Sequence, residues 1–175
     1  MEMVYDQGEL KTEQELVNLA QAMLANNMPY KSAKVILQGF KDKTVSESAK
    51  NLTLLGDSLM LAKEYTEAIK VLEQAADKSQ EGKDYFKVAQ LEVDRQLWSK
   101  ALEHLDKAIK LGGLTQEYNA YILKGTVLFN MNKLPKAKSE FEKALTYPQS
   151  KKAAEQWIAY IEAEEKRRAY IAENQ

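Results

Sequence analysis

The sequence contains no cysteine, only three prolines and seven glycines, and a single histidine among its 175 residues. The missing cysteines exclude disulfide bonds, zinc–thiolate centres and cysteine nucleophiles. The scarcity of glycine and proline argues against a loop-rich β fold and against long disordered stretches. Because metal sites recruit clustered ligands, we interpret the lone His104 as a partly exposed surface residue rather than a metal ligand or a catalytic base.

An excess of charge of one sign is also missing. The 25 basic and 26 acidic residues leave a formal charge of −1, so there is no electrostatic reason to expect nucleic acid or an anionic membrane as a partner. Acidic neighbours neutralise the basic run at 166–168, through helical pairs such as Glu162 with Lys166. No apolar run approaches the ~18 residues that span a bilayer. We expect a soluble protein with no direct membrane insertion.

No motif typical of catalysis is present. The sequence shows neither a glycine-rich phosphate loop nor a serine-nucleophile elbow, and the carboxylates near residue 164 are typical of a solvated helix face. We therefore predict that the protein is not an enzyme, with no catalytic residues, no metal site and no cofactor. The alternative, that the protein is an enzyme, would require a ligand in the groove that the sequence does not predict.

A pattern of large and small apolar residues repeats along the chain. Three segments align without gaps around Ala68, Ala101 and Ala137. In each, a large residue precedes the alanine by three positions, a second large residue follows it by four, and another alanine comes three later. Steps of three and four place all of these residues on one helical face. A weaker copy aligns Tyr30, Ala33, Leu37 and Phe40.

A second small residue precedes each anchoring alanine by twelve positions: Gly56, Ala89 and Gly125. Each unit therefore contains two helices. The ranges that we predict for the eight helices of the four units, and for a ninth that follows them, are 12–26, 29–42, 45–62, 65–79, 83–95, 98–111, 116–131, 134–147 and 149–172.

Helix boundaries have their own signals. Thr12 with Glu15, and Thr44 with Glu47, have the spacing of a capping box. Pro29 and Pro135 suit a first helical turn, while Gly82 and the pair 112–113 are expected to stop helices.

The repeat resembles the tetratricopeptide family, whose unit of about 34 residues is a helix–turn–helix. The residues that match the family pattern are Leu52, Leu55, Gly56, Leu59, Ala68, Leu72 and Ala75, and likewise Tyr121, Gly125, Leu128, Ala137, Phe141 and Ala144. Three positions depart from it: Gln21 at a small position, and Glu92 and Lys124 at apolar ones. The resemblance implies an all-α fold, a right-handed α-α superhelix (solenoid) of about four helix pairs.

The same resemblance divides the chain into parts. We expect an N-terminal extension at 1–11, a tetratricopeptide array at 12–148 and a C-terminal capping helix at 149–172, followed by a tail at 173–175. The units of the array are 12–44, 45–80, 81–114 and 115–148. A cap is needed because an uncovered last repeat would expose its packing face.

In the family, first helices line a concave surface that binds partners. The resemblance implies that the partner-binding residues of this groove are Asn18, Asn26, Lys50, Thr53, Asp57, Met60, Phe86, Gln90, Asp94, Asn119, Ile122, Thr126, Phe129 and Asn130. Internal packing does not require Met60, Phe86, Ile122 or Phe129, so these four are candidate anchors, with packing between adjacent repeats as the alternative.

The leading hypothesis is a non-catalytic scaffold that binds a protein or peptide partner in its concave groove. The alternative is a structural self-assembly module that forms a homodimer through its convex face or its first repeat. The ending from Trp157 to Arg168 resembles the tails of tetratricopeptide proteins that accompany TonB-type transport systems in Gram-negative bacteria. That resemblance implies an accessory protein in the periplasm, with the cytoplasm as the alternative compartment.

Overall fold

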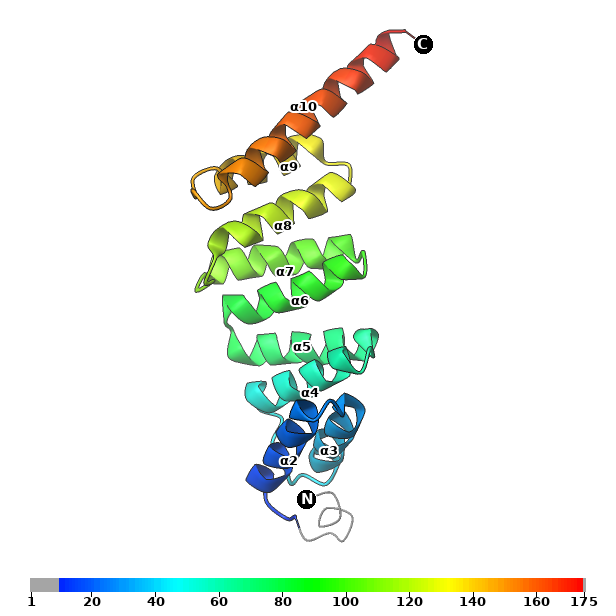
Figure 1. The fold of residues 1–175 in the computed structure, drawn as a ribbon, viewed down its shortest axis with the longest axis vertical. Helices are drawn as coiled ribbons and strands as arrows, with labels where there is room; N and C mark the ends of the chain where they lie inside the picture. Colours follow the sequence, from blue (N-terminus) through cyan, green and yellow to red (C-terminus); the bar gives the residue numbers. More distant parts are fainter. Residues whose placement is uncertain (1–9, 175) are drawn as a thin grey trace. The chain divides into compact units, whose positions relative to one another are not determined.

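The computed structural model describes residues 10–174, and every regular element in that range is an α-helix (Figure 1). Most of the predicted N-terminal extension and the last residue of the predicted tail lie outside the described residues. The chain divides into two compact units, one ending at Gln80 and the other beginning at Glu81, where we expected the second repeat to end. No helix within residues 10–174 combines the length and apolarity needed to cross a membrane.

Each unit is built from helix pairs. The first unit contains α2 (Glu13–Ala25), α3 (Pro29–Lys41), α4 (Ala49–Leu61) and α5 (Tyr65–Ser79). The second contains α6 (Gly82–Asp94), α7 (Trp98–Leu111), α8 (Glu117–Asn130), α9 (Leu134–Ala144) and the long α10 (Lys151–Glu173), which packs on α9. The all-helical fold class that the sequence predicts is confirmed.

The turns within the four pairs share one backbone geometry. Each first helix is followed by a residue with a left-handed φ of 57 to 66°, and the positions are Asn27, Lys63, Gln96 and Asn132. The N–H of the next residue bonds back to a carbonyl five positions earlier, as from Met28 to Met23 at 2.8 Å and from Lys133 to Leu128 at 2.9 Å. This double-bonded helix ending is a Schellman motif, formed at all four of these turns without glycine.

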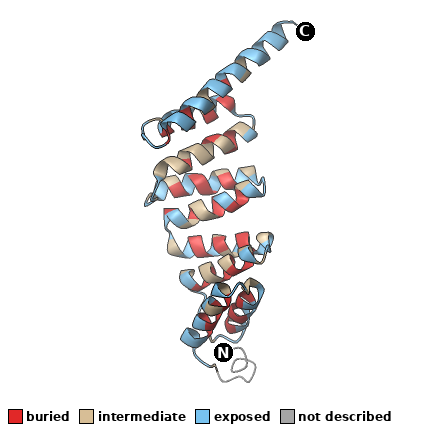
Figure 2. Ribbon diagram, viewed as in Figure 1, coloured by how far each residue is buried: buried red, intermediate tan, exposed pale blue. Residues whose placement is uncertain are grey.

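Small residues on the first helix of a pair receive large residues from the second. A Cβ atom added to Gly56 would lie 2.5 Å from Leu72 Cγ, and one added to Gly125 would lie 2.7 Å from Phe141 Cε1. Leu72 and Phe141 are themselves buried, and buried positions line the inner face of each helix pair (Figure 2). The predicted alternation of small and large residues is therefore the packing rule of this fold.

The register that we predicted for the first pair is wrong by one residue. Leu37 is 49% exposed and Tyr30 is 68% exposed, whereas Ile36 is fully buried. The residues that match Ala68, Leu72 and Ala75 are instead Ser32, Ile36 and Gly39, all buried. Likewise Ala20 is fully buried and Gln21 is exposed, so Ala20 holds the small position of α2. Serine and glycine substitute for alanine here because all three side chains are small enough for close helix approach.

The predicted capping box at Thr44 and Glu47 is also wrong. α4 begins at Ala49, and its N-cap is Ser48, whose hydroxyl accepts a hydrogen bond from the Asn51 N–H at 3.3 Å. The preceding segment is held by Val45, whose buried side chain fills the space above Gly39. In contrast, the capping box of Thr12 and Glu15 is confirmed at the start of α2.

The remaining boundaries are largely as predicted. Pro29 and Pro135 lie in first helical turns, and Gly112 ends α7. Gly82, however, does not stop a helix but begins α6. Glycine is needed at this position because a Cβ there would collide with the carbonyl oxygens of Ala108 and Gly112. α9 ends at residue 144, three residues earlier than expected, and the ninth predicted helix is confirmed as α10 at Lys151–Glu173.

Candidate functional site

The predicted groove residues lie on the first helices of the pairs, where their side chains are half-buried or exposed. α4 carries Lys50, Thr53, Asp57 and Met60; α6 carries Phe86, Gln90 and Asp94; and α8 carries Asn119, Ile122, Thr126, Phe129 and Asn130. Asn18 on α2 and Asn26 at its C-cap are exposed. Because of the corrected register, the residues of α2 equivalent to Thr53 and Asp57 are Val17 and Gln21.

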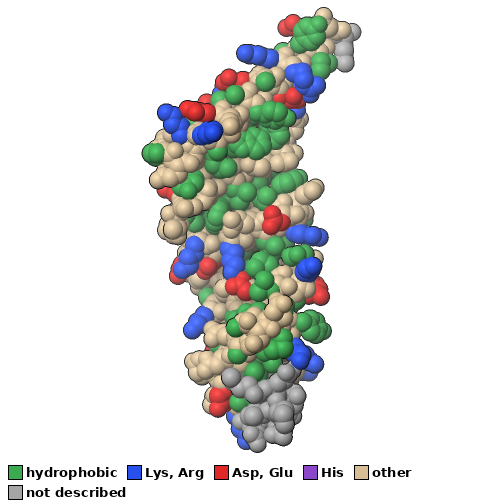
Figure 3. Space-filling view, viewed as in Figure 1, with side chains coloured by type: hydrophobic (Ala, Val, Ile, Leu, Met, Phe, Trp, Pro, Cys, Tyr) green, Lys and Arg blue, Asp and Glu red, His purple; other side chains and the backbone are tan. Residues whose placement is uncertain are grey.

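An open cavity of about 420 Å³ is formed between α8 and α10 in the second unit. Phe129 is the one predicted groove residue that lines it, and α10 supplies Ala153, Gln156, Trp157 and Tyr160. Figure 3 shows hydrophobic side chains gathered on the face formed by α8 and α10. The lining contains no charged side chain.

The aromatic rings of this cavity support one another. The Trp157 ring stacks on Phe141 with centroids 5.1 Å apart and planes 5° apart. Phe129 contacts Trp157 at 5.4 Å and Tyr160 at 5.5 Å between centroids. Tyr160 remains 56% exposed at the mouth. Phe129, Trp157 and Tyr160, which we call the aromatic pocket, therefore form a rigid apolar wall that is open on one side.

The position of this wall depends on a glycine. Phe141 is fully buried, and it lies in the space that a side chain on Gly125 would occupy. With no side chain at Gly125, Phe141 approaches α8 closely, and its ring also stacks on Trp157. The repeat pattern thus positions the pocket, since Gly125 and Phe141 are two of its defining residues.

A charge cluster follows the pocket along α10. Glu164 accepts hydrogen bonds from Arg167 Nε at 2.8 Å and from Arg168 Nε at 2.7 Å. These two guanidinium groups lower the pKa of the Glu164 carboxyl to about 2. Glu162, which we expected to pair with Lys166, binds Lys138 of α9 at 2.6 Å instead, because α9 brings that ammonium group within reach.

Sequence reasoning missed three lining residues: Ala153, Gln156 and Tyr160. All three lie in the predicted capping helix at 149–172, where Ala153 is exposed and lines the cavity. The available signal was the spacing of 153, 156 and 160, which places these residues on one helical face beside the buried stripe.

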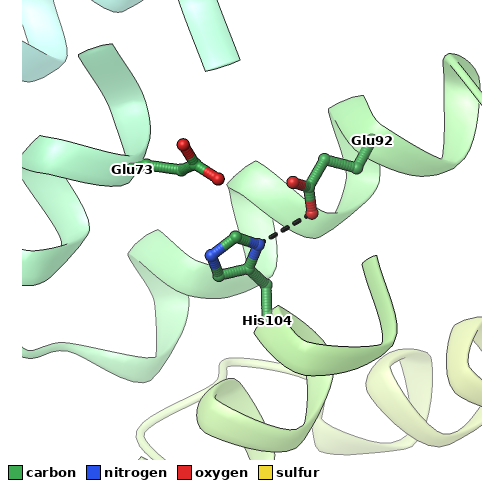
Figure 4. Close-up of side chains that lie close together, drawn as sticks. All are labelled: Glu73, Glu92 and His104. Atoms are coloured by element: carbon green, nitrogen blue, oxygen red, sulfur yellow. Dashed lines mark hydrogen bonds and ion pairs between the residues drawn. The ribbon is translucent and has the colours of Figure 1, made fainter. Parts of the chain in front are cut away.

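The interpretation of His104 as a surface residue is wrong. His104 is only 7% exposed, and its Nδ1 lies 2.8 Å from Oε2 of Glu92, which is fully buried (Figure 4). Tyr85 stacks on the imidazole with centroids 6.0 Å apart. Glu92 occupies a position that is apolar in the family pattern, and the histidine supplies the partner that a buried carboxylate requires.

Lys124, the other departure from the pattern, is compensated in a similar way. Its ammonium group lies 2.8 Å from Asp106 and 3.0 Å from Glu140. Burial lowers the pKa of Lys124, but the hydrogen bonds that its ammonium group donates to both carboxylates outweigh this effect and raise the pKa. These groups line a smaller cavity of about 240 Å³ between α7, α8 and α9, together with Lys133 and Lys136.

Known proteins resemble this chain in one repeat of its sequence and in the fold of most of its length. A family model described as tetratricopeptide repeat matches residues 118–151. No curated protein matches the sequence. Among solved structures, MamA 41-end from Desulfovibrio magneticus RS-1 superposes with a TM-score of 0.72 at 15% identity, covering 92% of this chain and 89% of that one.

Two further structures have the same fold. YrrB, described as a TPR protein with an unusual peptide-binding site, gives a TM-score of 0.71 at 17% identity, covering 94% of this chain and 82% of YrrB. A crystal structure of MamA gives 0.69 at 19% identity, covering 87% of this chain and 85% of that one. Residues 118–151 therefore match a tetratricopeptide repeat, and the chain shares the helical-repeat fold of these solved structures.

Proposed function

We propose that the protein is a non-catalytic interaction scaffold that binds a peptide or a helix of a partner protein. The observation that carries this proposal is the aromatic pocket between α8 and α10, with its volume of about 420 Å³. Ligand sites are concave and mostly apolar, with a few placed polar groups. Exposed aromatic side chains held rigidly by their neighbours are the usual anchors of protein interfaces.

The chemistry of the pocket favours an apolar side chain as its occupant. Three ring faces and a methyl group form the lining, and the amide of Gln156 is its polar side-chain group besides the Tyr160 hydroxyl. Within residues 10–174, no hydrogen-bond partner is described for that amide, so Gln156 is placed to donate to a peptide carbonyl and to accept from a peptide N–H. A single large apolar residue of the partner would enter the cavity while its backbone binds Gln156.

The other groove residues extend the proposed surface within each unit. On α8, Thr126 and Ile122 lie on the same helical face as Phe129, one and two turns earlier respectively. On α6, Phe86 is half-buried against the core that includes Ala89 and Leu105. We propose these positions, and those on α4, as secondary contacts that add specificity to the main anchor.

The test is capture of partners from a bacterial lysate, followed by titration of the identified peptide into purified protein. Tyr160→Ala removes the exposed wall of the pocket without a buried cavity and should weaken binding by about tenfold, as for an interface anchor worth more than 1 kcal/mol. Tyr30→Ala, at a similarly exposed tyrosine on α3, is the matched control and should bind as wild type. Equal binding by all three proteins would exclude the pocket as the site.

A periplasmic accessory role beside a TonB-type transporter remains a proposal that depends on the resemblance of the tail alone. Two residues of that tail, Trp157 and Tyr160, also line the pocket. Cell fractionation of a strain expressing the native gene, followed by detection of the protein in periplasm or cytoplasm, decides the compartment.

A further inference from the structure

The second half of α10 has an exposed surface that the fold does not use. Within α10, only Ala154 and Ile161 are buried, and every residue from 166 to 174 is exposed. The helix continues past the end of α9 (Figure 1), and its last turns are exposed on all sides (Figure 2). Tyr160, Tyr170 and Ile171 are nevertheless 56%, 69% and 40% exposed, which is costly for large apolar side chains.

Four residues on one face of α10 form a symmetric pattern. Tyr160, Glu164, Arg167 and Ile171 are separated by four, three and four residues, and steps of three and four keep side chains on one face. The order along this face is apolar, acidic, basic, apolar. Both the spacing and the chemistry are symmetric about a point between residues 165 and 166, with acid exchanged for base.

We propose that α10 pairs antiparallel with α10 of a second copy of this chain, about a two-fold axis at that point. Reversing the helix places Ile171 of the second copy opposite Tyr160, and Arg167 of the second copy opposite Glu164. Because a two-fold interface is isologous, each of these contacts occurs twice. The step of four, three and four residues is also the a/d spacing of helices that pack side by side in a coiled coil.

The charges within one copy are compatible with this pairing. Glu164 already binds Arg167 of its own chain through two hydrogen bonds of 2.8 Å, and Arg167 is exposed. Bringing a second copy across the axis adds another such pair in the opposite orientation. The four groups then alternate in sign around the axis, so that each carboxylate lies between two guanidinium groups.

A second copy fits this face better than a different protein because a single register satisfies both its apolar and its charged residues. The register that matches acid with base also brings Ile171 of the second copy to Tyr160, at the mouth of the aromatic pocket. The helix extends beyond α9, so the core of the second unit of each copy lies at opposite ends of the paired helices. One helix per copy makes a small interface, below the ~1,200 Å² of stable complexes, and the dimer should form at high micromolar concentration.

This pairing goes beyond the scaffold function and does not rest on it, because no partner peptide is involved. It does have a consequence for that function. Tyr160 would contact the second copy in the dimer and the peptide in the complex, so self-association and peptide binding should compete.

The test is sedimentation velocity over a concentration series from low micromolar to near-millimolar. Wild type should show a monomer–dimer equilibrium. Arg167→Glu places four carboxylates around the axis, and Glu164→Arg places four guanidinium groups there, so each variant alone should self-associate at least about tenfold more weakly, as like charges across an interface are unfavourable. In an equimolar mixture of the two variants, each carboxylate of one chain lies opposite a guanidinium group of the other, so the mixture should dimerise again.

The absence of cysteine allows an independent measurement of the register. Chains with Tyr160→Cys and chains with Ile171→Cys are mixed and oxidised. Antiparallel pairing should give the mixed 160–171 disulfide, because two residues 160 would lie about 16 Å apart along the helices, too far for a bond. Circular dichroism checks that each variant is as helical as wild type.

The outcomes are decisive in either direction. Recovery of the dimer in the charge mixture, together with the mixed disulfide, supports the pairing. Wild type that stays monomeric throughout, or a dimer that neither charge variant weakens, overturns it. If wild type self-associates but binds no peptide, only the scaffold proposal is refuted. Failure of the scaffold proposal can therefore be distinguished from failure of the pairing proposal.

Discussion

Gly125→Ala tests whether the packing of Phe141 against Gly125 determines the position of the aromatic pocket. A methyl group at residue 125 would lie 2.7 Å from two ring carbons of Phe141, where ordinary contact begins at 3.4 Å. The ring must therefore retreat by the difference, roughly 0.7 Å. Its movement is restricted, because Phe141 is fully buried and its ring also stacks on Trp157.

Two effects oppose each other in this variant. Alanine is favoured over glycine within a helix by about 1 kcal/mol, whereas overpacking a core costs about 1–3 kcal/mol. Since Phe141 is fully buried and also stacks on Trp157, we expect the upper part of that range and a net loss of about 1–2 kcal/mol in the free energy of unfolding. Movement of Phe141 should also displace Trp157 and weaken binding at the pocket.

The assay is urea unfolding followed by tryptophan fluorescence, with peptide titration on the same samples. Gly125→Ala combined with Phe141→Leu is the control, because the smaller side chain leaves room for the methyl group. The double variant should be more stable than the sum of the two single effects by about 1 kcal/mol, as for residues in direct contact. A Gly125→Ala protein that is more stable than wild type and binds normally would show that the ring is free to move, contrary to this reasoning.

Three further outcomes follow from the packing. His104→Leu leaves the buried Glu92 carboxylate without its histidine partner and should cost about 3–5 kcal/mol in chemical unfolding, while adding Glu92→Met should recover part of the loss; equal stability of His104→Leu and wild type would contradict this. Ile36→Ala should cost about 2–5 kcal/mol and Leu37→Ala less than about 0.5 kcal/mol, and the reverse order would restore the register predicted from sequence. The low pKa of Glu164, about 2 in the fold against 4.5 unperturbed, means that its contribution to α10 is complete above pH 4.5 and lost as the pH falls towards 2. Helicity of α10 by NMR chemical shift should decrease across that window in wild type but not in Glu164→Gln.

Much of the fold could be predicted because it depends on periodic small residues. Ala68, Ala101 and Ala137 are fully buried, and the spacing between them determines where the helices of three pairs begin. The first pair was misplaced because a neighbouring alanine, Ala33, offered an equally regular alignment. The correct alignment is determined by the segment that follows α3, because Val45 fills the space that the missing side chain of Gly39 leaves.

The site was harder to predict than the fold. Phe129 was identified because it lies on the groove face of a repeat helix, but Gln156 and Tyr160 are outside the repeat pattern. An amphipathic helix such as α10 shows its buried stripe through Ala154 and Ile161, whereas the spacing of 153, 156 and 160 places these residues on one face without indicating that they line a cavity. The buried pair formed by Glu92 and His104 was missed for a related reason: each residue alone is typical of a surface, and only their proximity makes burial favourable.

The shared turn geometry has a consequence for how the protein folds. A left-handed conformation is tolerated by asparagine at two of the four turns, but it costs about 1 kcal/mol or more for lysine or glutamine, which hold the other two positions, Lys63 and Gln96. A single helix pair buries too little apolar surface to offset that cost. The pairs therefore depend on one another thermodynamically, and an excised pair should populate unfolded conformations until a neighbouring pair docks against it.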